Sequence, residues 1–286
     1  MLLNSLDTIF AYIQDHHSSH GRNTNWYRFT NSVMKAALAE AKPAFEAGDP
    51  VLIGELGLIN LPYETMGSVD TLDLFGLDEL IIFAYYLRNS AAYESALDIG
   101  ANLGLHSIVL AKLGYSVSAY EPDPSHYSIL KHNLELNGVS QSVIATQAAI
   151  SDTNGSLEFV RVLGNTTGSH LAGSKSSPYG ALDRFPVDTI DFKCIVDAGT
   201  LAKIDAEGHE TVILRAIGWE RWSKLDAFVE IGTPANAMAV FEYFAKSPMN
   251  IFSQKTGWQK VLSAADMPNS HREGSIFITG RPEMNW

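Results

Sequence analysis

The stretch Ser95-Ala-Leu-Asp-Ile-Gly-Ala-Asn-Leu-Gly104 decides the fold that we expect for this chain. It is an apolar run that carries one acid, Asp98, and it stops at Gly100, with Gly104 following. Apolar residues then recur at helical spacing over 105–113. This order predicts a buried strand, a tight glycine turn and a helix. Such a turn lets the backbone approach a ligand closely and offers it the free N–H groups of the helix start.

A second strand, Ser116-Val-Ser-Ala-Tyr-Glu121, follows the first helix and ends in an acid. Glu121 lies about 20 residues after Gly100, which is the interval at which dinucleotide-binding folds place the acid that binds the ribose. We therefore expect Glu121 to accept hydrogen bonds from both hydroxyls of a ribose.

From residue 95 onward, predicted strands and helices alternate. The strands are 95–99, 116–121, 142–149, 156–162, 183–189, 201–205, 227–231 and 250–255, and the helices are 104–113, 125–137, 191–198, 208–217 and 235–245. This alternation predicts an α/β fold with a mostly parallel, doubly wound Rossmann-like sheet. Two further strands, 259–262 and 275–279, have no helix between them and predict an antiparallel C-terminal edge hairpin.

The first 90 residues are expected to form a mainly helical N-terminal cap, and residues 91–286 the ligand-binding domain. Helical periodicity appears over 2–13, 33–41 and 72–87, whereas 51–66 is strand-like. The helix 72–87 is so apolar that it must be buried, against the sheet edge or the ligand cleft. A polar segment rich in Gly, Ser and Thr, 164–180, is long enough to be a binding loop.

The composition excludes several classes of protein. The net charge of −12 argues against a broad nucleic-acid or anionic-membrane surface. No stretch approaches the ~20 continuous apolar residues of a membrane-spanning helix, and residues 1–13 lack a signal-peptide pattern. The single cysteine, Cys194, excludes an internal disulfide and a cysteine-cluster zinc site. We therefore expect a cytoplasmic protein.

The glycine turn departs from the nicotinamide-type fingerprint G-x-G-x-x-G. Gly100 matches the first glycine, but Asn102 and Leu105 replace the second and third. The pattern Asp-x-Gly-x-Asn-x-Gly instead resembles the first motif of class I S-adenosylmethionine-dependent methyltransferases.

A third stretch, Leu201-Ala-Lys-Ile-Asp-Ala-Glu-Gly-His-Glu210, ends a predicted strand in a cluster of ionisable residues. Ligands of doubly wound sheets bind beyond the carboxyl ends of the strands, so Asp98, Glu121 and Asp205 should face one crevice. Acids crowded together are costly unless a cation compensates them. The sulfonium and amino groups of S-adenosylmethionine are cations, and a metal ion is another option.

Together these stretches resemble the FkbM-type methyltransferase family. The matching segments are 97–104, Ala119-Tyr-Glu-Pro-Asp-Pro124 with Asn133 and Asn137 downstream, Val187-Asp-Thr-Ile190 and 203–210. The resemblance covers about residues 95–232. It implies a class I Rossmann-like fold, S-adenosylmethionine as methyl donor, and O-methylation of a hydroxyl on a sugar or natural product. The N-terminal 90 residues show no resemblance, and we expect substrate choice to lie there.

These observations define the expected site. The predicted cofactor-binding residues are Asp98, Gly100, Ala101, Asn102, Gly104, Glu121, Asp152 and Asp205. A hydroxyl must lose its proton as it is methylated, so a general base has to lie within hydrogen-bond reach. Asp205 or Glu207 is the expected base, with His209 as the alternate. No metal ligand is assigned, although a divalent ion shared by these acids is an alternative.

Other interpretations stay open. A nicotinamide-dependent oxidoreductase would share the sheet and the ribose acid, and a catalytically idle binding or scaffold protein would share the fold. The expected partner is a small-molecule or carbohydrate acceptor, with no nucleic acid and no membrane. The helix 72–87 would also serve a homodimer. His170 and the pair His271-Arg272 are candidate substrate contacts. His106, in the first turn of the cofactor helix, is expected either to lie near the ligand or to be a helix-surface or packing histidine.

Overall fold

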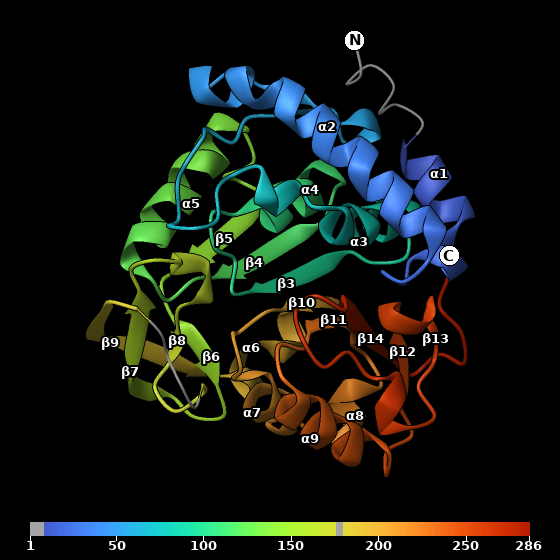
Figure 1. Ribbon diagram of the computed structural model, residues 1–286. Helices are drawn as coiled ribbons and strands as arrows, with labels where there is room; N and C mark the ends of the chain where they lie inside the picture. The colour runs from blue at the N-terminus through green and yellow to red at the C-terminus, as the bar shows by residue number, and fades with distance from the viewer. Residues whose placement is uncertain (1–8, 176–179) are drawn as a thin grey trace.

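The computed structural model describes residues 9–175 and 180–286, and these form a central sheet with helices on both faces (Figure 1). In spatial order the strands are β13 (Gln259–Lys260), β12 (Asn250–Ser253), β14 (Ser275–Thr279), β11 (Asp226–Glu230), β10 (Leu201–Ile204), β3 (Ser95–Ile99), β4 (Ser116–Tyr120) and β5 (Val143–Thr146). Strand β3 runs parallel to its neighbours β4 and β10, and β11 runs parallel to β10. The expected doubly wound, mostly parallel α/β sheet is confirmed.

The antiparallel C-terminal strands are also present. Strand β14 is inserted between β11 and β12 and runs antiparallel to both, while β13 pairs with β12 as a hairpin at the edge. The expected pairing of 259–262 with 275–279 is therefore wrong. All five residues of β14 are buried, as suits the interior of a sheet, whereas both residues of β13 are exposed.

The helices divide between the two faces of the sheet, and each face has its own hydrophobic core. One face carries α1 (Ile9–Asp15), α2 (Asn25–Ala47), α3 (Leu77–Arg88), α4 (Leu105–Lys112) and α5 (Pro124–Leu136). The other carries α6 (Phe192–Ile195), α7 (Glu210–Arg215), α8 (Trp219–Trp222) and α9 (Pro234–Phe244). Within the described ranges, no helix has both the length and the apolar character needed to cross a membrane.

The N-terminal helices pack into the same core as α4 and the sheet. The helix expected at 72–87 begins at Leu77, because a short 3-10 turn, η4 (Asp73–Phe75), ends at Gly76. Its Tyr85 ring contacts Phe228 of β11 and Phe277 of β14, so α3 lies on the face of the sheet rather than at its edge. The segment 51–66, which the sequence predicts to be strand-like, contains the short antiparallel pair β1 (Val51–Leu52) and β2 (Leu58–Ile59). The predicted helical residues before position 9 lie outside the described residues.

A smaller sheet follows β5. Its strands, in spatial order, are β6 (Ala149–Ser151), β9 (Leu182–Asp191), β7 (Gly155–Val162) and β8 (His170–Leu171). Strand β7 pairs with β9 along its whole length, from Gly155 opposite Thr189 to Val162 opposite Leu182. The sequence predicted strands at 156–162 and 183–189, but it did not predict that they leave the main sheet and form this one.

Candidate active site

The glycine turn after β3 lies against the ends of two other strands. The N–H groups of Gly100 and Ala101 both donate to the carbonyl oxygen of Tyr120, each at 3.0 Å. Gly100 has a φ of +78°, and a Cβ there would lie 1.8 Å from the carbonyl oxygen of Asp205. Only glycine fits this position without displacing backbone atoms. The turn therefore holds the ends of β3, β4 and β10 close together.

Glu121, directly after β4, is buried beside this turn. Its Oε2 accepts from the N–H of Asn102 and its Oε1 accepts from the N–H of Asp123, both at 2.8 Å. Burial raises the pKa of Glu121 to about 8, although these two N–H groups oppose the shift. In its deprotonated form the carboxylate offers about four lone-pair sites, so each oxygen can then accept one more hydrogen bond. This geometry suits the two hydroxyls of a ribose.

Asp98 is fully buried behind the turn. Its Oδ2 accepts from the hydroxyl of Ser107 at 2.6 Å, and its Oδ1 has no hydrogen-bond partner among the described residues. Lys203 stands opposite Asp98 in the β3–β10 ladder. Burial opposes the charge of Lys203, but Asp205, Asp98 and nearby glutamates together raise its pKa. Lys203 was not selected from the sequence, although its place two residues before Asp205 puts it on the same face of the strand.

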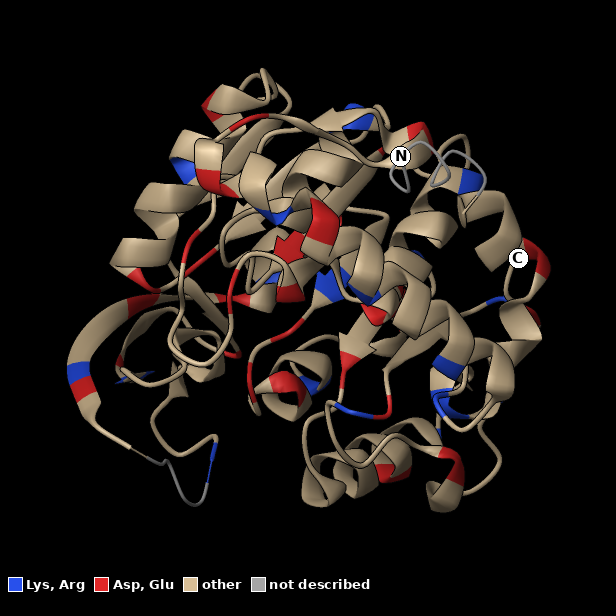
Figure 2. Cartoon of the chain, turned by 45° about the horizontal axis from the view of Figure 1, so that its top comes forward, with Lys and Arg blue, Asp and Glu red and all other residues tan. Residues whose placement is uncertain are grey.

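A cavity of about 600 Å³ opens beyond the carboxyl ends of these strands. Of the residues expected to form the site, its described lining includes Gly100, Asn102, Glu121, Asp205, Glu207 and His209. It does not include Asp98, Ala101, Gly104 or Asp152. Two of the three acids expected in one crevice, Glu121 and Asp205, thus share this cavity, whereas Asp98 lies behind it. Figure 2 shows acidic residues, in red, on loops and strand ends in the middle of the view, with basic residues among them.

Two of the acids after β10, Asp205 and Glu207, are each paired with a lysine. The Oδ2 of Asp205 lies 3.2 Å from Nζ of Lys203, and the Oε2 of Glu207 lies 2.5 Å from Nζ of Lys175. Burial, and then the charge of Asp205, raise the pKa of Glu207 to about 7, against the opposing effect of Lys175. Glu207 is therefore poised to exchange a proton near neutral pH. Lys175 is distant in sequence from this strand, and no local pattern points to it.

His209 is held between two hydroxyl groups. Its Nε2 lies 2.9 Å from Oγ of Ser151, and its Nδ1 lies 3.2 Å from Oγ of Ser174. Burial lowers the pKa of His209, with Asp152 opposing the shift, so the ring is neutral at neutral pH. Asp152 itself is exposed at the surface after β6. An adenine contact by Asp152 stays a prediction.

Part of the predicted binding loop lines the cavity. Residues 165–171 and Lys175 are in the lining, as are the two candidate contacts His170 and His271. Residues 176–179 of this loop lie outside the described residues. His106 does not belong to the described lining, because its ring lies between Glu79, at 2.7 Å, and Tyr86, at 3.2 Å.

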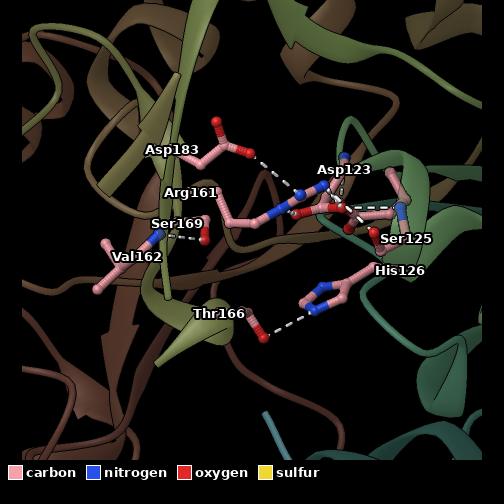
Figure 3. Close-up of polar contacts among 9 residues, drawn as sticks. Asp123, Ser125, His126, Arg161, Val162, Thr166, Ser169 and Asp183 are labelled. Carbon is pink, nitrogen blue, oxygen red and sulfur yellow. Dashed lines mark hydrogen bonds and ion pairs between the residues drawn. The ribbon is translucent and has the colours of Figure 1, made fainter. Parts of the chain in front are cut away.

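An arginine joins the smaller sheet to the start of α5 (Figure 3). Nε and Nη2 of Arg161 donate to the two carboxylate oxygens of Asp123 at 2.7 and 2.6 Å. Asp123 is 1% exposed and also accepts from the N–H of Ser125, so it caps α5. Beside this pair, Nε2 of His126 lies 3.0 Å from Oγ1 of Thr166. Asp123, His126 and Thr166 all line the cavity, so these contacts fix one of its walls.

We expect Arg161→Met to lower the free energy of unfolding by about 2 kcal/mol, because Asp123 is then buried without its bidentate partner. Arg161→Lys should recover part of the lost stability, since lysine keeps the positive charge but cannot donate to both carboxylate oxygens in parallel. The more exposed contact of Arg161 with Asp183 supplies the matched control, and Asp183→Asn should cost less than about 0.5 kcal/mol. Urea denaturation measures all three, and equal losses for Arg161→Met and Asp183→Asn would contradict this role.

Glu121 should also make stability depend on pH. Its pKa is about 8 in the folded protein against an ordinary value of 4.5, so the folded state binds the proton more tightly than the unfolded state does. Stability contributed by the protonated form is present below about pH 4.5 and is lost as pH rises through about 8. We expect the unliganded protein to lose a few kcal/mol over this range, and Glu121→Gln to flatten the decline. Melting temperatures from pH 5 to 9 test this, with the exposed Glu135→Gln as control; parallel wild-type and Glu121→Gln profiles would refute it.

The described residues contain no group of three or more histidine, cysteine, aspartate or glutamate side chains placed to hold a metal ion. The compensating cations that the structure shows near the acids are Lys175 and Lys203.

The sheet order, with β14 antiparallel between β11 and β12, and the glycine turn after β3 define the class I methyltransferase fold, with helices added at the N-terminus. No protein-family model matches the chain. The curated methyltransferase sdnD of Sordaria araneosa is 26% identical over 174 residues, which cover 48% of this chain and 66% of that protein. The match thus spans slightly less than two thirds of that relative.

Solved structures to which this chain is similar include an O-methyltransferase from Bacillus cereus in complex with SAH, at 11% identity and a TM-score of 0.38, covering 85% of this chain and 89% of that one. Another is the O-methyltransferase TomG from Streptomyces achromogenes, in complex with SAM, at 11% identity and a TM-score of 0.37, covering 68% of this chain and 77% of that one.

Proposed function

We propose that this protein is an S-adenosylmethionine-dependent methyltransferase of the FkbM type that methylates a hydroxyl group on a sugar or natural product. The observation that carries the proposal is the position of Glu121. It lies on the wall of the 600 Å³ cavity beside Gly100 and Asn102, with free acceptor sites on both carboxylate oxygens. The motifs of the sequence and the curated methyltransferase relative support the same conclusion.

The residues present fit the donor. Glu121 would accept the ribose hydroxyls, and the Oδ1 of Asn102, which has no partner within the described chain, would accept a donor group of the ligand. The acids around the cavity would offset the positive charge of the sulfonium. When bound, S-adenosylmethionine would supply an electrophilic methyl group, which would pass from the sulfur to the acceptor oxygen and leave S-adenosylhomocysteine as the second product.

The chain's own contribution is to align the acceptor and to take its proton. Alignment of the acceptor oxygen with the methyl group can supply much of the acceleration. Asp205 and Glu207 remain the proposed bases, with His209 as the alternate. Among them Glu207 is favoured, because its pKa of about 7 lets its carboxylate receive a proton near neutral pH and release it to solvent afterwards.

The N-terminal region would contribute to acceptor choice. Val69, Asp73 and Leu74 line the same cavity, so residues before the first central strand reach the site where the acceptor must come. This supports the proposal that residues 1–90 act as a cap and substrate region for the domain formed by 91–286.

We expect Glu207→Gln to lower kcat by about 100-fold with any hydroxyl acceptor that the wild type methylates, because the amide cannot take the proton. Asp205→Asn should have a smaller effect if Glu207 is the base. Turnover is followed as formation of S-adenosylhomocysteine, and its binding to each variant shows that the donor site is intact. The exposed Glu220→Gln is the matched control. Full turnover in both Asp205→Asn and Glu207→Gln would exclude this base assignment.

A further inference from the structure

A second cavity of about 240 Å³ adjoins the first. The two cavities share Asp73, Glu230 and His271 in their walls. The second lies between α2 and the start of α3, so it is bounded by the N-terminal helices on one side and by the end of β11 on the other. A ligand that fills it would therefore reach the ends of the central strands past Glu230.

Glu230 differs from the other acids of the larger cavity. Glu121 accepts from backbone N–H groups, Asp205 and Glu207 face lysines, and Glu210 accepts from the N–H groups of Ala206 and Gly208. The carboxylate of Glu230 makes no hydrogen bond or ion pair with any residue that the structure describes. It is thus free to accept a hydrogen bond from a ligand at the junction of the two cavities.

The walls of the second cavity are polar and fixed in place. Besides the shared residues, the lining is Arg22, Tyr27, Asn31, Lys35, Gly76, Leu77, Asp78, Glu79, Gly274 and Ser275. The carboxylate of Asp78 pairs with Arg22 and accepts from the hydroxyl of Tyr27 and, at 2.6 Å, from the amide of Gln254. This network ties α2, α3 and the segment after β12 into one wall, so the cavity is shaped before a ligand arrives.

The volume of the second cavity and the chemistry of its walls limit the class of ligand that it can bind. At the ~30 Å³ that a water molecule occupies in the liquid, the space corresponds to about eight waters, which suits one ring carrying several hydroxyls. Carboxylates accept from hydroxyl groups, whereas Asn31 and Lys35 can donate to them. A flat aromatic or aliphatic alcohol would leave these groups desolvated and unpaired, which is costly.

We propose that the second cavity binds the hydroxyl-rich part of the methyl acceptor and that Glu230 accepts a hydrogen bond from the hydroxyl presented to the larger cavity. This inference rests on the proposed function and adds to it the place and the chemical class of the acceptor. Glu230 is a substrate-binding residue here, while proton removal stays with the acids after β10. Burial, with the charges of Asp205, Glu207 and Glu79, raises the pKa of Glu230, which lets it hold a hydroxyl group as donor or acceptor.

The experiment uses the full chain saturated with S-adenosylhomocysteine and two sets of probes. Methyl α-glucopyranoside, myo-inositol and glycerol represent hydroxyl-rich groups, and benzyl alcohol and cyclohexanol represent apolar alcohols. Saturation-transfer NMR and calorimetry measure their binding. We expect the hydroxyl-rich probes to bind the wild type, and Glu230→Met, which removes both the donor and the acceptor at similar size, to weaken them by about tenfold or more while S-adenosylhomocysteine affinity stays within about twofold.

Asn31→Leu, on the opposite wall, supplies a second variant at a half-buried helix position, and Glu220→Gln on α8 is the control. Asn31→Leu should weaken the same probes, and the control should not. The inference is overturned if no hydroxyl-rich probe binds, if apolar alcohols bind better, or if both variants bind the hydroxyl-rich probes as the wild type does. Failure of S-adenosylhomocysteine to bind the wild type would instead refute the proposed function, so the two failures are distinct.

Discussion

Gly100→Ala is expected to destabilise the protein by about 4 kcal/mol or to prevent folding. The new Cβ would lie 1.8 Å from the carbonyl oxygen of Asp205, and the residue must also hold a φ of +78°. Neither the β3 turn nor the segment after β10 can move aside, because the N–H of Asp205 donates to the carbonyl of Ile99 at 3.0 Å. Overlap with backbone therefore adds to the cost of the left-handed conformation.

The variant Gly114→Ala separates the cost of the left-handed conformation from the cost of overlap with backbone atoms. Gly114 has a φ of +95°, but a Cβ there meets no atom within 4 Å. This variant should lose about 1 kcal/mol from backbone conformation alone. Chemical denaturation measures both, and equal losses at the two positions would show that the turn is not pressed against the end of β10.

The second large effect is expected at Glu121. Glu121→Ala should weaken binding of adenosine and of S-adenosylhomocysteine by about 100-fold, because hydrogen bonds from two ribose hydroxyls to a buried carboxylate are lost. The loss should nearly vanish with 2′,3′-dideoxyadenosine, which lacks both hydroxyls. Calorimetry with the wild type, Glu121→Ala and the control Glu135→Ala gives each affinity. If Glu121→Ala weakened the dideoxy ligand as much as adenosine, the carboxylate would not be the ribose acceptor.

The central part of the site could be predicted because the residues that form it lie close together in the sequence. The strand, the turn at Gly100 and the acid after the next strand follow one another within one strand–helix–strand unit, and parallel neighbours bring their carboxyl ends to one edge. Glu121 and Asp205 therefore meet at the same cavity, as their positions in the sequence indicated. Lys203 could also have been predicted near the site, since it lies two residues before Asp205 and so on the same side of the extended chain.

Other features depend on pairing between distant segments. The insertion of β14 between β11 and β12, and the pairing of β7 with β9, leave no mark in hydrophobic periodicity. The arginine that holds Asp123 comes from strand β7 of the smaller sheet, and the lysine that holds Glu207 follows strand β8 of that sheet, so neither could be found before the sheet was known. The position of Asp98 could be predicted only in part. Its place in the strand indicates which face of the sheet its side chain is on, but not whether the cavity extends to that side chain.

The most direct test of the central claim is a pair of titrations of the wild-type protein, one with S-adenosylhomocysteine and one with NAD⁺. The account predicts saturable binding of S-adenosylhomocysteine with one site per chain, weakened about 100-fold in Glu121→Ala, and no comparable binding of NAD⁺, because Asn102 and Leu105 replace the glycines of the nicotinamide fingerprint. Binding of NAD⁺ without S-adenosylhomocysteine, or of neither ligand, would contradict it.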